Sequence, residues 1–169
     1  MAHYYGRAAW TSSAPPVARL VALDPAHVRG IAVHHTGSSV PLGGRSTFRR
    51  SARRLEDDRL LVTADRGWPD IAYQVAVDVD GRVFECRGLE FRPQANGNAT
   101  ANAQYGAVTL LLGAGDELTP AMIDAFGEWR RTRWLARYPT AIAVVGHRDL
   151  YPTPCPGHAV DALIRSGTL

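Results

Sequence analysis

Short apolar runs, bounded by glycine or turn residues, recur along the chain and predict its strands. Each run is four to seven residues long and rich in valine, isoleucine or alanine, which is typical of buried strands. Asp80 and Gly81 separate two of the runs and predict the tight turn of a hairpin. The predicted strands cover residues 30–35, 73–79, 82–85, 108–112 and 141–145.

Apolar residues at helical spacing lie between these strands. Ser46 is a candidate cap for a helix that ends near residue 60 and buries one apolar face. Thr119 and Pro120 predict the start of a second helix, which Pro139 ends. A last helix is expected at about residues 157–165. Strands that alternate with helices predict an α/β domain with a single central sheet.

The length of 169 residues, with 46% hydrophobic and 21% charged residues, fits one self-sufficient globular domain. This composition excludes intrinsic disorder, collagen-like repeats and coiled coil. We therefore treat residues 1–169 as one domain, in which residues 1–29 form an N-terminal arm on the core. The first residues lack the apolar stretch of a signal peptide, and no run approaches the length of a membrane span. A protein made in a cytoplasm, with no membrane partner, is expected.

The charged residues exclude several kinds of active site. Nineteen basic and 16 acidic residues give a net charge of +3, and every basic residue is arginine. The absence of lysine excludes a lysine nucleophile, a Schiff base and a phosphate-binding loop that needs lysine. The mild positive charge suits an anionic polymer but is no nucleic-acid signature. Arginines concentrated in the helix after Ser46 are interpreted as a solvated face, with attraction to an anionic polymer as the alternative.

Candidate metal ligands follow two of the predicted strands. His147 comes directly after one strand, and Cys155 follows eight residues later across a loop stiffened by three prolines. Zinc accepts imidazole and thiolate ligands together, and a catalytic zinc keeps three protein ligands and one open position. His34 and His35 end another strand, where successive side chains face opposite sides. One of the two would complete the site, and the spacing does not say which.

Two other residues leave alternatives open. His158 lies three residues after Cys155, and as a fourth ligand it would close the site and make the zinc structural. Cys86 has no histidine or second cysteine beside it, so we interpret it as a buried thiol.

Several motifs stand out together along the sequence. They are His34-His35-Thr36, Gly67-Trp68-Pro69-Asp70-Ile71-Ala72-Tyr73, Asp80-Gly81-Arg82-Val83-Phe84-Glu85 with Arg87-Gly88, and Gly146-His147-Arg148-Asp149 with Cys155-Pro156-Gly157. Together they resemble the zinc amidase and peptidoglycan recognition protein family, over about residues 7–164. The segment 7–10 is also similar to the opening of that family. The resemblance implies a mixed, mostly parallel sheet flanked by helices, with a groove for a glycan strand and its stem peptide.

The resemblance implies roles for particular residues. It implies one zinc ion per chain, held by His34, His147 and Cys155. It also implies that Tyr73 contacts the zinc-bound water or the scissile carbonyl. The bond cut would be the amide between N-acetylmuramic acid and L-alanine. Thr153 stands where some phage members have lysine and is expected to help Tyr73 stabilise the oxyanion.

The remaining site residues are expectations about acid catalysis and substrate contact. Glu85 is a candidate general acid. The Gly67-Trp68 pair is associated in this family with diaminopimelate-type stem peptides. Residues 94–102 depart from the family's Gly-Ala-His-Ala segment, so contacts there are expected from asparagine amides. The expected substrate-binding residues are His35, Thr36, Gly67, Trp68, Asn96 and Asn98.

Three hypotheses of function follow. The first is a zinc amidase that lyses bacterial walls, expected as a monomeric phage endolysin without a separate wall-binding domain. Such a protein would be made in the host cytoplasm without a signal peptide and act on the wall after release. The second is a non-catalytic peptidoglycan-binding module, which in this family usually lacks the ligand cysteine. The third, a nucleic-acid binder, has no recognised motif in this sequence, and no nucleic acid is expected as a partner.

Overall fold

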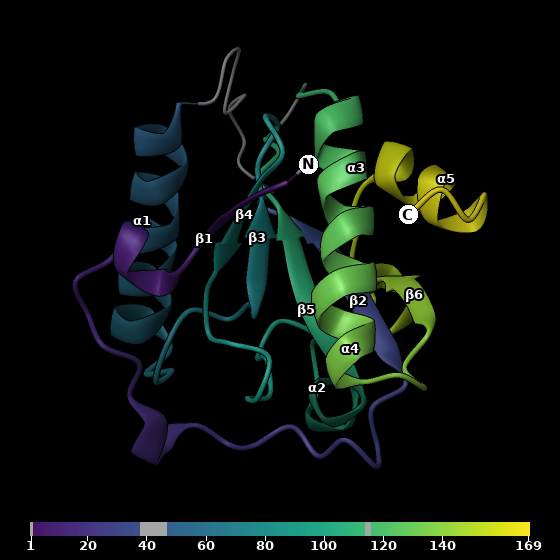
Figure 1. Cartoon of the computed structure of the whole chain (residues 1–169). Coiled ribbons are helices and arrows are strands. Elements are labelled where there is room, and N and C mark those ends of the chain that lie inside the picture. Colours follow the sequence, from purple (N-terminus) through teal and green to yellow (C-terminus); the bar gives the residue numbers. More distant parts are fainter. Residues whose placement is uncertain (1, 38–46, 114–115) are drawn as a thin grey trace.

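A six-stranded sheet forms the centre of the computed structural model, which describes residues 2–37, 47–113 and 116–169 (Figure 1). The strand order is β1-β4-β3-β5-β2-β6, and every neighbouring pair is parallel except β3 and β4. The expected mixed, mostly parallel sheet is confirmed. The strands are β1 (His3–Tyr5), β2 (Gly30–His35), β3 (Val75–Val77), β4 (Arg82–Glu85), β5 (Tyr105–Leu110) and β6 (Ala143–Gly146).

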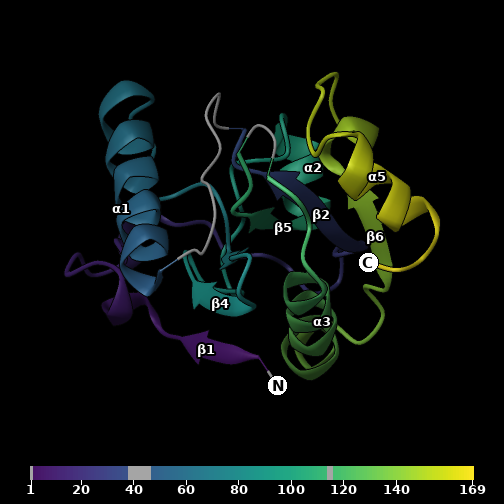
Figure 2. The ribbon, with the colours of Figure 1, turned by 90° about the horizontal axis from the view of Figure 1, so that it is seen from above.

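Helices cover both faces of this sheet (Figures 1 and 2). On one face, Leu55 of α1 (Phe48–Asp65) packs in a cluster with Ala76 and Phe84. The larger cluster on the other face includes Phe126 of α3 and Val160 of α5. Because neighbouring residues of a strand face opposite sides, β3 and β4 contribute to both clusters. The bounds on this second face are α3 (Pro120–Trp129) and α5 (His158–Arg165).

The N-terminal arm is part of the sheet and of both cores. β1 pairs in parallel with β4 at the edge, a strand that the sequence pattern did not predict. The indole of Trp10 is buried and donates a hydrogen bond to the carbonyl of Glu85 at 2.7 Å. Arg7 forms a buried ion pair of 2.8 Å with Asp70. The arm is therefore tied to the core by strand pairing, an indole hydrogen bond and a paired charge.

The helix starts follow their capping signals. Thr119 caps α3 as predicted, and its side chain accepts from the backbone N–H of Met122. The helix continues through a π-helical segment (Arg130–Trp134) and α4 (Leu135–Arg137) before Pro139. α1 is capped by Thr47 and runs beyond residue 60, while the expected cap Ser46 lies outside the described residues.

One short helix was not predicted from the sequence pattern. α2 (Ala99–Gln104) begins after Asn98, whose side chain accepts from the backbone N–H of Ala101 at 2.8 Å. This is an N-cap, a signal present in the sequence but obscured by the asparagine-rich composition around it. Within the described residues, none of the helices combines the length and apolarity that crossing a membrane requires.

Candidate metal centre and groove

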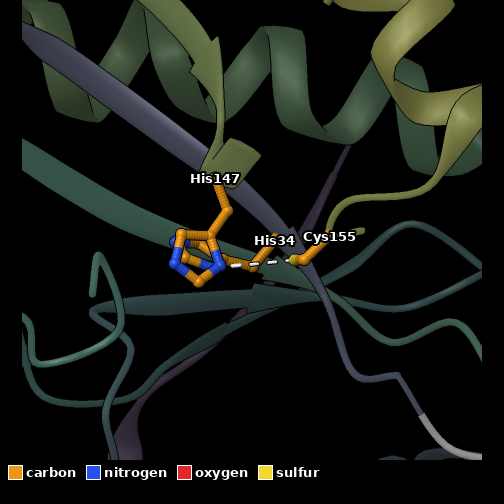
Figure 3. Close-up of side chains that lie close together, drawn as sticks. All are labelled: His34, His147 and Cys155. Carbon is orange, nitrogen blue, oxygen red and sulfur yellow. Dashed lines mark hydrogen bonds between the residues drawn. The ribbon is translucent and has the colours of Figure 1, made fainter. Parts of the chain in front are cut away.

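Three potential metal ligands meet at the ends of neighbouring strands: His34, His147 and Cys155. One ligand atom from each lies within 4.8 Å of the others. Figure 3 shows the two imidazole rings close together, with the sulfur of Cys155 directed towards His34. The ring centroids of His34 and His147 are 4.4 Å apart, and Cys155 Sγ lies 3.8 Å from His34 Nδ1. The parallel arrangement of β2 and β6 brings together residues more than 110 positions apart.

The sheet decides between the two adjacent histidines. Ile31 and Val33 of β2 point into the core beneath α3 and α5, so the alternating residue His34 faces the opposite side. His34 is 1% exposed and lies in the cluster. His35 meets Cys155 only through its backbone N–H, which lies 3.5 Å from Sγ. The structure thus brings the first histidine of the pair to the candidate metal centre.

Asn96 holds the ring of His34 in one tautomer. Its Oδ1 lies 2.9 Å from His34 Nε2. Its Nδ2 donates to the carbonyls of Ala101 at 3.3 Å and Tyr105 at 2.9 Å, so Oδ1 must be the atom that faces the ring. Nε2 therefore carries the hydrogen atom and donates a hydrogen bond to Asn96 Oδ1. Nδ1 is left with a free lone pair directed at the cluster.

Burial keeps both imidazoles of the cluster neutral. The pKa of His34 falls to about 3, mainly because burial disfavours the charged form and secondly because His147 is close. Burial also lowers the pKa of His147. Burial raises the pKa of the Cys155 thiol, against an opposing effect of the His35 N–H. Without a cation the thiol stays protonated, and a bound cation would favour the thiolate.

The loop from β6 to α5 carries His147 and Cys155 and is closed by its own hydrogen bonds. The backbone N–H of Arg148 donates to the carbonyl of Cys155 at 3.0 Å, which joins the two ends of the loop. Asp149 Oδ2 accepts from the N–H of Gly146 at 2.8 Å. Thr153 Oγ1 accepts from the N–H of Cys155 at 3.3 Å. These bonds hold the imidazole and the thiol in a fixed relationship before any ligand binds.

The donor set fits zinc. His147 Nε2 is buried and has no hydrogen-bond partner within the part of the chain that the structure describes. An orphaned buried nitrogen is costly unless a ligand satisfies it. Two neutral imidazole nitrogens and one sulfur are a set that zinc accepts. His158 is exposed at the start of α5 and is not part of this cluster, so nothing here supports a closed four-ligand site.

A groove of about 670 Å³ runs over the cluster between α1 and the loop from β6 to α5. Tyr73 lies in this groove with its ring edge-on to His34, at a centroid distance of 5.4 Å. Burial raises the pKa of the Tyr73 hydroxyl above its ordinary value, and the nearby Cys155 acts in the same direction. Tyr73 therefore keeps its proton at neutral pH. Thr153 also lines the groove.

The expected substrate-binding residues divide into two groups. His35, Thr36 and Trp68 line the groove, and their contact with a substrate stays a prediction. Gly67, at a φ of +62°, makes the left-handed turn after α1 and lies outside the groove lining. Asn98 is exposed and caps α2.

The expectation for Asn96 needs correction. Its side chain was expected to contact substrate, but it is fully buried and its amide is occupied by His34 and two backbone carbonyls. Sequence reasoning missed this supporting role because the partner carbonyls belong to a helix and a strand that only the fold brings close.

The expectation for Glu85 also needs correction. Glu85 lines a separate pocket of about 300 Å³, together with Tyr4, Trp129 and Arg133, and not the groove that holds the cluster. Because neighbouring residues of β4 face opposite sides, Glu85 points away from the face that carries Phe84. It therefore cannot deliver a proton to a substrate bound at the cluster.

The wall formed by α1 supplies charged residues on a helix that was interpreted from the sequence as a solvated face, with attraction to an anionic polymer as the alternative. Arg54 and Asp58 line the groove and form an ion pair of 3.1 Å. Burial raises the pKa of Asp58, and Arg54 opposes this effect. The guanidinium of Arg66 lies over the ring of Trp68, at 4.8 Å from the centroid. Periodicity shows which residues share a helix face, but not which face borders a groove.

Two tryptophans and a thiol are buried away from the groove, and the burial of the thiol of Cys86 was predicted from the sequence. Trp129 and Trp134 are buried in the larger core. Cys86 is 1% exposed, and burial raises the pKa of its thiol. Cys86 and Cys155 are both free cysteines.

The mixed α/β domain carries a histidine–histidine–cysteine cluster under an open groove, an arrangement that could hold a metal ion beside a bound ligand. Residues 24–158 match the model of the N-acetylmuramoyl-L-alanine amidase family. This match covers most of the chain, and the chain belongs to that family.

Individual relatives agree with this assignment. The chain is 28% identical over 140 residues to the human N-acetylmuramoyl-L-alanine amidase. The matched segment covers 79% of this chain but only 23% of the human protein. The fold matches bumblebee peptidoglycan recognition protein SA with a TM-score of 0.82 and 20% identity, covering 98% of this chain and 95% of that one. It also matches recognition protein LE, in complex with tracheal cytotoxin, a monomeric diaminopimelic acid-type peptidoglycan. Here the TM-score is 0.77 and the identity 19%, with 95% and 91% coverage.

Proposed function

We propose that this protein is a zinc-dependent amidase that hydrolyses the bond between N-acetylmuramic acid and L-alanine in peptidoglycan and thereby lyses bacterial walls. The observation that carries the proposal is the cluster of His34, His147 and Cys155 within 4.8 Å, directly beneath a groove that also contains Tyr73. Family membership supports the choice of the amide bond.

The residues of the cluster would hold one zinc ion per chain. His34 offers Nδ1, because Asn96 occupies Nε2, and His147 offers its unpartnered Nε2. Cys155 would bind as thiolate, and two neutral imidazoles with one thiolate would leave the site at +1. When bound, zinc supplies Lewis acidity and lowers the pKa of water towards about 7.

Tyr73 would stabilise the charge that develops on the carbonyl oxygen of the scissile amide. Its hydroxyl keeps its proton, because burial raises its pKa. It can therefore donate a hydrogen bond as the oxygen becomes negative, and such a donor contributes about 10²-fold or more in rate. The backbone of Tyr73 is fixed because its carbonyl accepts from the N–H of Arg87 at 3.1 Å.

Thr153 would act on the same side of the groove. Its Oγ1 already accepts from the N–H of Cys155, which leaves its own proton free to donate towards the substrate. Thr153 supplies one hydrogen bond without a charge, in a position where a lysine would add a full positive charge.

The groove supports a preference for diaminopimelate-type stem peptides. At the end of α1, the ring of Trp68 forms an apolar part of the groove wall, and the guanidinium of Arg66 lies over that ring. The additional carboxylate of diaminopimelate would pair with an exposed arginine there. The complex of recognition protein LE with a diaminopimelic acid-type ligand agrees with this preference.

The experiment is dye release from purified cell walls, with zinc and with a chelator. Soluble fragments that carry new N-terminal L-alanine, lost on chelation and restored by zinc, would support the proposal. Binding to walls without release of fragments would contradict it and identify a recognition module instead. The monomeric state, the phage origin and the absence of nucleic-acid and membrane partners stay predictions.

A further inference from the structure

Tyr151 presents an exposed aromatic ring inside the groove, next to the candidate metal centre. Its side chain is 46% exposed and lines the groove. Its ring is stacked beside that of His147, with an interplanar angle of 20° and a centroid distance of 6.0 Å. The ring therefore lies beside a cluster residue, and part of its surface is available to a ligand.

The segment before α2 holds this ring in place. A Cβ atom added to Gly97 would lie 2.3 Å from Tyr151 Cγ, so the backbone of residue 97 packs directly against the ring. Gly97 also has a φ of +87°, which a side chain rarely tolerates. Asn98 Nδ2 donates to the carbonyl of Leu150 at 3.4 Å, and the N–H of Tyr151 donates to the carbonyl of His147 at 3.0 Å. The ring is thus ordered before a ligand arrives, which reduces the entropy cost of binding.

The two sides of the groove differ in charge. On the α1 side the lining includes Arg54, Asp58 and Arg66. On the opposite side, formed by the segment before α2 and the loop that leads into α5 (Figure 2), the described lining carries no arginine or carboxylate. The residues that line this second side beyond the cluster are Gln94, Ala95, Gly97, Tyr151, Thr153 and Pro154.

The substrate has a matching asymmetry. The scissile amide joins a stem peptide, which carries carboxylates, to a sugar, which is an uncharged ring with an apolar C–H face and a polar rim. With the amide at the cluster, peptide and sugar leave it in different directions, so each can lie against a different side of the groove. Carboxylates suit the side with arginines. A sugar face suits a tyrosine, which offers a flat apolar surface and a hydroxyl.

We propose that Tyr151 is the binding platform for the N-acetylmuramic acid ring and that the stem peptide lies along α1. This inference rests on the proposed amidase function. Gly97 is a positioning residue for the platform, which gives the segment before α2 a function other than direct contact through asparagine amides.

The test uses the zinc-loaded protein and two substrates that share the same scissile bond. One is an N-acetylmuramoyl peptide, and the other is the matching lactoyl peptide without the sugar. Tyr151→Ala should lower kcat/KM for the muramoyl peptide by about tenfold, through KM, and leave the lactoyl peptide unchanged. Tyr151→Phe should lose much less than Tyr151→Ala on the muramoyl peptide, because the ring remains and only the hydroxyl is removed. Gly97→Ala should reproduce the selective loss by displacing the ring without removing it.

Controls separate this role from a structural one. Tyr4→Ala removes another exposed tyrosine that lies outside the groove, and it should leave kcat/KM for both substrates unchanged. Each variant should retain one zinc per chain. If Tyr151→Ala lowers kcat/KM equally for both substrates, or for neither, the proposal that Tyr151 binds the sugar is wrong. If the zinc-loaded wild type binds both compounds but hydrolyses neither, the amidase proposal fails. The role of Tyr151 is then tested by dissociation constants, because Tyr151→Ala should weaken binding of the muramoyl peptide and not of the lactoyl peptide.

Discussion

Asn96 Oδ1 accepts a hydrogen bond from His34 Nε2 at 2.9 Å, in the fully buried interior beneath the groove. Because the Asn96 amide nitrogen is anchored to two backbone carbonyls, the acceptor cannot turn away. A residue outside the candidate ligand set thus determines which nitrogen of His34 faces the metal centre.

Asn96→Leu should weaken zinc binding by about 10- to 100-fold, because the His34 N–H loses its acceptor and the ring its fixed orientation. Asn96→Asp keeps the acceptor and should retain most of the affinity. Competition with a chromophoric chelator measures both dissociation constants. Asn98→Ala is the matched control, since Asn98 caps α2 without touching His34. Equal affinities for Asn96→Leu and the wild type would show that Asn96 does not support the site.

His147→Ala and Cys155→Ala should each lose stoichiometric zinc, because two remaining ligands bind the ion far more weakly. His35→Ala and His158→Ala should each keep one zinc per chain, since both side chains lie outside the cluster. Metal analysis after dialysis gives the stoichiometry directly. A Cys155→Ala protein that retains both zinc and wall lysis would show that the ligand set is wrong.

Tyr73→Phe should retain zinc and the folded structure but lose about 10²-fold or more in turnover. The ring still packs beside His34, while the hydroxyl that donates to the developing oxyanion is gone. Rates on a soluble muramoyl peptide separate kcat from KM. Wild-type turnover in this variant would remove Tyr73 from the mechanism.

The metal-free protein should lose stability as the pH falls below about 6.5. In the native state the pKa of His34 is about 3, whereas its ordinary value is 6.5, so the unfolded chain binds a proton that the native chain refuses. The free energy of unfolding therefore decreases as the pH falls through this window, by up to about 1.4 kcal/mol per pH unit. The lowered pKa values of His35 and His147 act in the same direction.

Urea denaturation of the metal-free protein between pH 7 and 5 measures this slope, in a range where most carboxylates stay ionised. His34→Gln should reduce the slope even if it lowers the overall stability. A stability that is flat or rises as the pH falls to 5 would contradict the assignment of His34 as a buried neutral imidazole.

Trp68→Ala should reduce the preference for diaminopimelate-type over lysine-type walls by about tenfold with zinc retained, because Arg66 loses the ring over which it lies. Initial rates on both wall types, stripped of secondary polymers, give the ratio. Trp68→Phe keeps a flat ring and should preserve part of the preference. A wild type that cuts both wall types equally would show that Trp68 sets no peptide specificity.

Local pattern was enough for the elements with strong signals. The strand at residues 30–35 was predicted with its observed bounds, because a glycine precedes a continuous apolar run that leads directly into the two histidines. The start of α3 followed from Thr119 and Pro120. β1 was missed because three residues, His3–Tyr5, form a strand only where β4 offers an open edge.

The sequence by itself determined the residue types of the candidate centre, since imidazoles and a thiol at strand ends already indicate zinc chemistry. The tertiary structure placed His34 rather than His35 at the cluster, because the facing of a strand residue depends on which side of the sheet the core covers. It likewise buried Asn96 against His34 and turned Glu85 away from the groove. These assignments depend on which faces and loops become neighbours, and that is decided by packing between segments far apart in the chain.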